Sequence, residues 1–142
     1  AEEAILGGVI QPGEVVVIRY EGPKGGPGMR EMFKAMKYMY GAGLSKTCAL
    51  VTDGRFSGTN NCCFVGHISP EAAEGGPLAI VKDGDEILID VNEGKLELHV
   101  PEEEIKERFK TWKRPEKDIP RGYLRLYAKV ASSADKGAII KN

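Results

Sequence analysis

The sequence predicts a single mixed α/β domain, and three patterns support that prediction. β-Branched and apolar residues run together over 14–20 (EVVVIRY), as in a buried strand. Apolar residues recur at spacings of three and four over 29–40, as on one face of a helix. Residues 78–100 alternate short apolar runs with turn sequences, as in antiparallel strands. The length of 142 residues suits one domain that buries a sizeable core.

Glycine and proline dominate the segment that follows the first strand. Residues 21–28 read EGPKGGPG, so no regular structure is expected there. We expect a tightly shaped loop over a ligand rather than a linker, because this segment, the Gly/Pro loop, joins a strand to a helix within one domain. Residues 1–6 have helical character but begin without a cap, which indicates a fragment of a longer protein.

The helix over 29–40 is expected to bury one apolar stripe, which consists of Met29, Met32, Phe33, Met36, Met39 and Tyr40. Gly41 and Gly43 should end this helix. Glu31 lies in its first turn and off the stripe. Two interpretations of Glu31 remain open: a carboxylate that favours the positive end of the helix dipole, or a metal ligand that faces the Gly/Pro loop.

A polar loop lies between two apolar runs near the middle of the chain. The runs are 48–51 (CALV) and 62–65 (CCFV), and the central loop between them, 52–61, reads TDGRFSGTNN. Gly54 and Gly58 allow the backbone to approach a ligand closely, and successive N–H groups in such a turn can bind a carboxylate. An ordinary loop between two strands is the alternative, since these residue types are common in turns.

The region after the central loop predicts short strands and a short helix. A strand should continue over 65–68, and a helix over 69–74 should begin with Ser69 as its cap and Pro70 at its first position. A meander of three strands should follow, over 78–81, 86–91 and 96–100.

Two further helices are expected in the last third of the chain. The first covers 101–112 and the second 122–132, with a linker over 114–120 between them and a loose tail over 136–142. Their apolar faces should consist of Ile105, Phe109 and Trp112 in the first, and of Leu124, Tyr127, Ala128 and Ala131 in the second.

Composition argues against several classes of function. A net charge of −1 gives no electrostatic reason to expect nucleic acid or an anionic membrane as a partner. No apolar run reaches the roughly 20 residues of a spanning helix and no signal peptide is recognisable, so a cytoplasmic location is the default expectation. Cys48, Cys62 and Cys63 form no metal-binding spacing and no even set, so we expect buried, reduced thiols.

Several long motifs, in order, resemble those of one family. They are RYEGPKGGPGM at 19–29, GAGL at 41–44, DGRFSG at 53–58, GHISPEA at 66–72 and EGGP at 74–77. Over nearly its whole length the chain resembles the carboxy-terminal domain of the dihydroxy-acid dehydratase and phosphogluconate dehydratase family, closest to the dihydroxy-acid branch. The resemblance implies one domain over 1–142, with a barrel-like β centre and flanking helices of the swivelling-domain type.

The same resemblance implies a hydro-lyase that converts a 2,3-dihydroxy carboxylic acid to a 2-keto acid with Mg2+ and an iron–sulfur cluster. In that family the serine corresponding to Ser57 is the proposed base, and the glutamate corresponding to Glu31 is a magnesium ligand. A serine hydroxyl needs a cation beside it to act as a base near neutral pH, and a bound metal lowers the pKa of coordinated water by about eight units. Backbone amides at Gly58 and Thr59, beside Ser57, are expected to orient the substrate carboxylate.

The remaining metal ligands and the cluster ligands belong, in that family, to an amino-terminal domain, which is therefore the expected partner of this one. The isolated domain is expected to be inactive, and the parent enzyme to be a homo-oligomer. If Glu31 and Ser57 share a cation, the two side chains must lie close together. An apolar or glycine-rich face should mark where the partner domain binds.

The substrate remains open between two branches of the family. Asn60-Asn61-Cys62-Cys63 departs from the family's pattern, whereas DGRFSG and GHI favour the branched 2,3-dihydroxy acids of valine and isoleucine biosynthesis. A sugar acid, such as an aldonate or phosphogluconate, is the alternative substrate. A second alternative is a non-catalytic binding module with the same fold.

Overall fold

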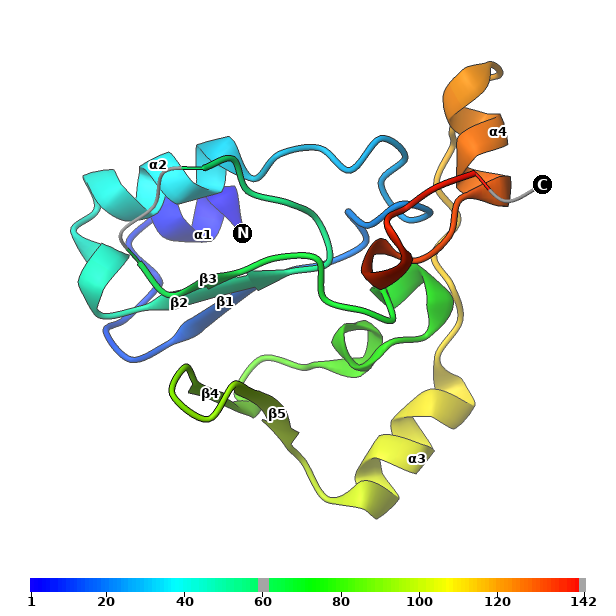
Figure 1. Cartoon of the computed structure of the whole chain (residues 1–142). Coiled ribbons are helices and arrows are strands. Elements are labelled where there is room, and N and C mark those ends of the chain that lie inside the picture. Colours follow the sequence, from blue (N-terminus) through cyan, green and yellow to red (C-terminus); the bar gives the residue numbers. More distant parts are fainter. Residues whose placement is uncertain (59–61, 141–142) are drawn as a thin grey trace.

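A three-stranded parallel sheet lies at the centre of the computed structural model, which describes residues 1–58 and 62–140 (Figure 1). Its strands are β1 (Val15–Ile18), β2 (Ala49–Thr52) and β3 (Phe64–Val65), in the order β1-β2-β3. β2 is the central strand, and all four of its residues are buried. The central loop therefore begins at the carboxyl end of the most buried strand.

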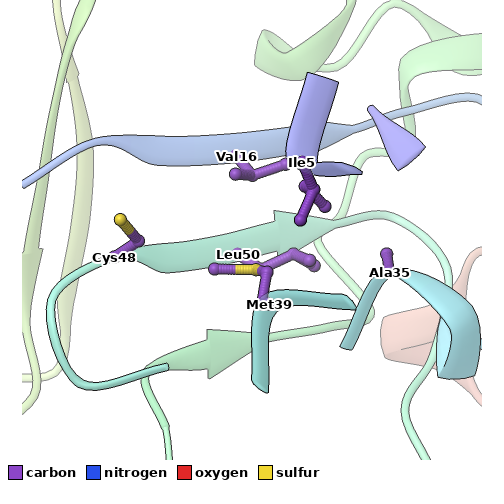
Figure 2. Close-up of a cluster of buried hydrophobic side chains, with 6 residues drawn as sticks. All are labelled: Ile5, Val16, Ala35, Met39, Cys48 and Leu50. Carbon is purple, nitrogen blue, oxygen red and sulfur yellow. The ribbon is translucent and has the colours of Figure 1, made fainter. Parts of the chain in front are cut away.

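Helices α1 (Glu2–Leu6) and α2 (Phe33–Gly41) cover one face of this sheet (Figure 1). Figure 2 shows the cluster that they form with the sheet, in which Ile5 of α1 and Met39 of α2 meet Val16 and Leu50 of the strands. Ile5, Met39 and Leu50 are almost completely buried. Because α2 is anchored here, the segment that leads into it from the Gly/Pro loop has a fixed end.

A second cluster lies on the opposite face of the sheet. Val51 alternates with Leu50 along β2 and contacts this second cluster, as the period of two along a strand requires. The cluster also receives the apolar residues of two short 3-10 helices, Ala72–Glu74 and Pro77–Ile80, and of α3 (Glu102–Thr111). The hairpin of β4 (Glu86–Asp90) and β5 (Lys95–His99) completes this side.

Most elements lie where the sequence predicts them. The strand at 14–20, the last two strands of the meander and the helix over 101–112 are confirmed, with Ile105, Phe109 and Trp112 against the second cluster. The helix over 122–132 is α4 (Tyr123–Val130). The mixed α/β class is confirmed, whereas the described residues form no closed barrel. None of the described helices is long and apolar enough to cross a membrane.

The predicted helix over 29–40 begins four residues too early. α2 starts at Phe33, and the buried face of α2 consists of Ala35, Met36 and Met39, whereas Phe33 is 45% exposed. Tyr40, also predicted on the buried stripe, is exposed as well. Met29 and Met32 are buried, but they precede the helix because their segment contacts the central loop, where the Met32 N–H donates to the Arg55 carbonyl at 2.9 Å. Glu31 is therefore not in a first helical turn.

Three predictions between residues 65 and 81 are also wrong. β3 ends at Val65 because His67 adopts a positive φ of 57°, which a strand does not accommodate. Ser69 caps no helix, since the 3-10 helix that follows begins after Glu71. The apolar run 78–81 lies largely in the 3-10 helix Pro77–Ile80 and forms no strand.

The end of the described chain is better ordered than predicted. The Ser132 N–H donates to the Ile139 carbonyl at 2.8 Å, and Ala131 and Ile140 form a bridge, so this segment folds back on the end of α4. Leu124, predicted on the buried face of α4, is half exposed, while Ala128 and Ala131 are buried as expected. Residues 141 and 142 lie outside the described residues.

A nearly buried ion pair joins α3 to the turn before β4. Arg108 donates from Nη2 to Asp85 Oδ1 at 2.8 Å and from Nη1 to the Ile80 carbonyl at 3.0 Å. The hydrogen bonds from Arg108 lower the pKa of Asp85 to about 2. Because the pKa of Asp85 is lower in the folded chain than its ordinary value of 3.8, the ionised carboxylate stabilises the fold at every pH above 3.8. This stabilisation is lost as the pH falls from 3.8 through about 2.

We therefore expect Asp85→Asn to lower the free energy of unfolding at pH 7, and the difference from the wild type to shrink as the pH falls from 3.8 toward about 2. Urea unfolding followed by circular dichroism measures both quantities. Asp83→Asn, an exposed neighbour in the same turn, is the matched control and should change neither. A difference that stays constant with pH would contradict the assigned role of the ion pair.

Candidate functional site

Ser57 and Glu31 lie in contact at the surface of the domain. The Ser57 hydroxyl donates a hydrogen bond to the Glu31 carboxylate, although the two residues are 26 positions apart in sequence. Both side chains are exposed. The structure thus brings together the two residues that the sequence singled out, close enough for one cation to contact both.

Backbone contacts between two segments create this meeting. Glu31 and Arg55 form an isolated parallel bridge, which places the segment before α2 alongside the central loop. Arg55 also donates from Nε to the Met29 carbonyl, so both its backbone and its side chain hold the same segment. Glu31 consequently faces Ser57 because of the fold of the loop rather than because of a helix dipole.

The central loop is itself held against the sheet. The Phe56 ring stacks on Phe64 of β3, with ring centroids 5.3 Å apart. The Gly54 N–H donates to Thr52 Oγ1 at 2.9 Å, and a Cβ at Gly54 would lie only 3.1 Å from the Glu21 Cβ. Gly54 is therefore needed for close approach of the Gly/Pro loop, and Ser57 follows a well-anchored turn.

The Gly/Pro loop folds around a buried carboxylate. Glu71, 2% exposed, accepts hydrogen bonds from the N–H groups of Lys24 at 2.9 Å and Gly25 at 2.7 Å. A Cβ at Gly22 would lie 2.7 Å from Glu71 Oε2, so no side chain fits there. Burial raises the pKa of Glu71, and the two N–H donors oppose that shift. The predicted tight shape of this loop is confirmed, and the expectation that the loop lies over a ligand stays a prediction.

Asp53 is a second buried carboxylate and lies at the end of β2. It is fully buried and accepts hydrogen bonds from the N–H groups of Tyr20, Glu21 and Ala72 at 3.1, 2.9 and 2.9 Å. Sequence reasoning assigned no role to Asp53 or Glu71. The available signal for Asp53 was an acidic residue only two positions after the apolar run 48–51, where a solvated carboxylate is not expected.

The remaining predicted binding residues are only partly described. Gly58 is exposed and has a φ of 40°, a conformation that favours glycine. Thr59, predicted to orient the substrate, lies outside the described residues, as do Asn60 and Asn61. The cysteines are free, with Cys48 buried in the first cluster and Cys62 and Cys63 half-buried.

The donor set at Ser57 and Glu31 suits a hard cation. A carboxylate and a hydroxyl are oxygen ligands of the kind that Mg2+ prefers. The part of the chain that the structure describes gathers no group of three or more His, Cys, Asp or Glu residues around one point. The pair therefore fits part of a magnesium site, whereas the three free cysteines, two of them adjacent in sequence, are fewer than the four thiolates that such iron–sulfur clusters take.

The Gly/Pro loop borders a cavity and an exposed apolar face, both of which lie apart from the pair's own side chains. A cavity of about 790 Å³ lies between the Gly/Pro loop and residues 114–119, lined by Tyr20, Lys24 and Arg125 among others. Neither Ser57 nor Glu31 lines it. α4 exposes Tyr123, Leu124 and Leu126 near the Gly/Pro loop, where a Cβ at Gly28 would lie 3.6 Å from the Leu124 side chain. This exposed apolar face is of the kind that a partner covers.

Comparison with known proteins identifies relatives over the whole chain. The chain is 57% identical to a dihydroxy-acid dehydratase of Acetivibrio thermocellus over 142 residues, which are 100% of this chain and 26% of that protein. It is 59% identical to a dihydroxy-acid dehydratase of Aquifex aeolicus over 141 residues, 99% of this chain and 25% of that protein. The chain thus spans about a quarter of the length of these curated relatives.

The family described as "Dihydroxy-acid/6-phosphogluconate dehydratase C-terminal" matches residues 1–138. That match covers both segments that meet at Ser57 and Glu31, and it agrees with the names of the relatives. The chain belongs to the family of carboxy-terminal domains of dihydroxy-acid and 6-phosphogluconate dehydratases.

Proposed function

We propose that the full-length protein that contains this chain removes water from a 2,3-dihydroxy carboxylic acid to leave a 2-keto acid, with Ser57 as the base. The observation that supports this most directly is the hydrogen bond from the Ser57 hydroxyl to the Glu31 carboxylate at an open surface. The relatives named dihydroxy-acid dehydratase support the reaction class.

Glu31 would hold Mg2+ together with oxygen ligands from the rest of the protein. The bond to Ser57 places the serine oxygen beside that carboxylate, within reach of the same ion. When bound, Mg2+ would supply the positive charge that makes the serine hydroxyl a stronger acid. A carboxylate alone is too weak a base to deprotonate serine, so Glu31 orients the hydroxyl and does not itself remove the proton.

The steps assigned to this chain balance as a loss of one water. Ser57 Oγ, after it has lost its own proton to solvent, takes the proton from C2 of the substrate. The C3–O bond breaks, and the departing hydroxide takes up a proton and leaves as water. The resulting enol gains a proton at C3 and loses the proton of its C2 hydroxyl, which gives the 2-keto acid. The proton that Ser57 took from C2 returns to solvent, so the net change is the loss of one water. Backbone N–H groups near Gly58 would bind the substrate carboxylate, as anions bind to turns of this kind.

Branched 2,3-dihydroxy acids are the proposed substrates, which places the enzyme in branched-chain amino acid biosynthesis. The names of the relatives favour this branch over the sugar acids that the family description also covers. An iron–sulfur cluster, a partner amino-terminal domain, a homo-oligomeric parent, a swivelling-domain architecture and a cytoplasmic location stay predictions.

A substrate panel tests the proposal. The full-length protein, reconstituted anaerobically with iron, sulfide and Mg2+, is assayed for 2-keto acid formation from 2,3-dihydroxyisovalerate and from several sugar acids. We expect turnover of the branched acid, and we expect Ser57→Ala to lower it about a thousandfold. Turnover confined to a sugar acid would move the enzyme to the other branch, and no turnover of any acid would favour a binding module.

A further inference from the structure

Asp53 joins three segments of the chain at one buried point. Its Oδ2 accepts hydrogen bonds from the N–H groups of Tyr20 and Ala72, and its Oδ1 accepts one from the N–H group of Glu21. The residue itself is completely buried. Hydrogen bonds to an ionised acceptor are about twice as strong as neutral ones, so these three bonds fix the backbone firmly.

Two of the three segments lead to the Ser57–Glu31 pair, and the third holds one of those two in place. Asp53 is four residues before Ser57 on the central loop. Tyr20 and Glu21 open the Gly/Pro loop, which ends at the segment that carries Glu31. Ala72 follows Glu71, whose carboxylate holds the same loop at Lys24 and Gly25. Asp53 therefore fixes the point at which the central loop, which carries Ser57, and the Gly/Pro loop, which leads to Glu31, leave the core.

A continuous series of bonds connects this point to the pair. The Gly26 N–H donates to the Gly22 carbonyl at 2.8 Å, and the Met29 N–H donates to the Gly26 carbonyl at 2.8 Å. Arg55 then binds the Met29 carbonyl and pairs with Glu31. A displacement of the Gly/Pro loop at Tyr20 and Glu21 would thus be carried through to Glu31, while Ser57 stays on the central loop, which leaves the carboxyl end of β2 (Ala49–Thr52).

We propose that Asp53 is a positioning residue that sets the geometry between the Ser57 hydroxyl and the Glu31 carboxylate by holding the Gly/Pro loop to the central loop. The inference rests on the proposed function, because it assigns Asp53 an effect on that catalytic pair. Asp53 does not touch substrate or metal in this role and acts through the backbone of Tyr20 and Glu21.

Asp53→Asn is the most direct variant. It keeps the shape of the side chain but replaces one acceptor oxygen by an NH2 group, which faces an N–H donor and cannot bind it. A misplacement of about 1 Å costs about a hundredfold in rate, and loss of a group that orients a metal ligand costs about 10- to 100-fold in metal affinity. We expect kcat to fall about a hundredfold and Mn2+ affinity about tenfold, with little change in KM.

Asp85→Asn is the matched control. Asp85 is also a nearly buried aspartate whose carboxylate accepts several hydrogen bonds, but it binds Arg108 and Lys82 next to the β4–β5 hairpin. Its loss should lower the melting temperature of the full-length protein without changing kcat or Mn2+ affinity. Asp53→Ser is a second variant for the case that Asp53→Asn does not fold, since it leaves room for a water to accept the freed N–H groups.

The experiment compares these variants in the full-length, reconstituted protein by melting temperature, by kcat and KM, and by Mn2+ binding followed by electron paramagnetic resonance. The inference is supported if Asp53 variants that remain folded lose kcat and Mn2+ affinity while Asp85→Asn loses only stability. It is overturned if both aspartates affect stability alone. Ser57→Ala and Glu31→Gln, run alongside, separate the two proposals: if those variants keep full turnover and Mn2+ affinity, the proposed function itself fails.

Discussion

Replacing Ser57 by alanine in the full-length protein is expected to lower the kcat of the proposed reaction about a thousandfold, the middle of the range that a positioned general base contributes. The side chain is exposed and its hydroxyl binds Glu31, so its removal leaves no buried group without a partner. The melting temperature should therefore stay near that of the wild type, because surface substitutions of this kind change stability by at most about 0.5 kcal/mol.

Measurement of 2-keto acid formation under saturating substrate gives kcat directly. Ser45→Ala is the matched control, since Ser45 lies in the 3-10 helix Leu44–Lys46 after α2 and is no part of the site. It should leave kcat unchanged. A Ser57→Ala variant that keeps more than about a tenth of the wild-type kcat would show that another group removes the C2 proton.

Replacing Glu31 by glutamine is expected to raise the Mg2+ concentration for half-maximal activity about a hundredfold, the upper end of the loss seen when groups around a metal ligand are removed. Glutamine keeps the size of the side chain and an oxygen that can accept the Ser57 hydrogen bond, but it removes the negative charge. The effect should therefore appear as weaker metal binding rather than as a displaced serine, since affinity for such ions depends on the charge of the ligands.

Mg2+ titration of the activity and Mn2+ binding in the absence of substrate measure this effect independently. Glu93→Gln, in the exposed turn between β4 and β5, is the matched control for the loss of one carboxylate. It should leave both quantities unchanged. Equal Mg2+ dependence in the Glu31→Gln variant and the wild type would exclude Glu31 as a ligand.

The parts of the fold that sequence predicts well are those in which one local pattern has one explanation. The β-branched run at 14–20 and the strand-turn-strand pattern at 86–100 produced β1 and the β4–β5 hairpin. The apolar run 78–81 has no such unique explanation, because a short buried run fits a strand or a helical turn equally well. The choice depends on packing against α3, which lies more than 20 residues away.

The same limit explains the wrong start of α2. Met29 and Met32 continue the helical spacing of Met36 and Met39, and all four are buried. The first two are buried for a different reason, since their segment pairs with residue 55 of the central loop. The spacing of apolar residues indicates which residues are buried, but not whether a helix buries them. The predicted helix therefore included Met29 and Met32, which are buried but precede α2.

Sequence predicts some residues of the candidate site and misses others. Sequence predicts Ser57 because it stands in the motif DGRFSG, and Glu31 because it lies two residues after the motif RYEGPKGGPGM and the chain resembles a family whose corresponding glutamate is a metal ligand. Asp53 and Glu71 were missed because their partners are backbone N–H groups at positions 20, 21, 24, 25 and 72. Backbone donors leave no trace in the sequence, so only the folded chain reveals such a contact.

One contact of Trp112, the only tryptophan in the sequence, has a practical consequence. Its Nε1 donates to the Tyr20 hydroxyl at 3.1 Å, and the backbone N–H of the same tyrosine is bound by Asp53. Indole emission responds to hydrogen bonding and to the polarity around the ring. The tryptophan fluorescence of this domain therefore reports on the contact between Tyr20 and Asp53, where the Gly/Pro loop begins. A change in the position of that loop can be followed without an added label.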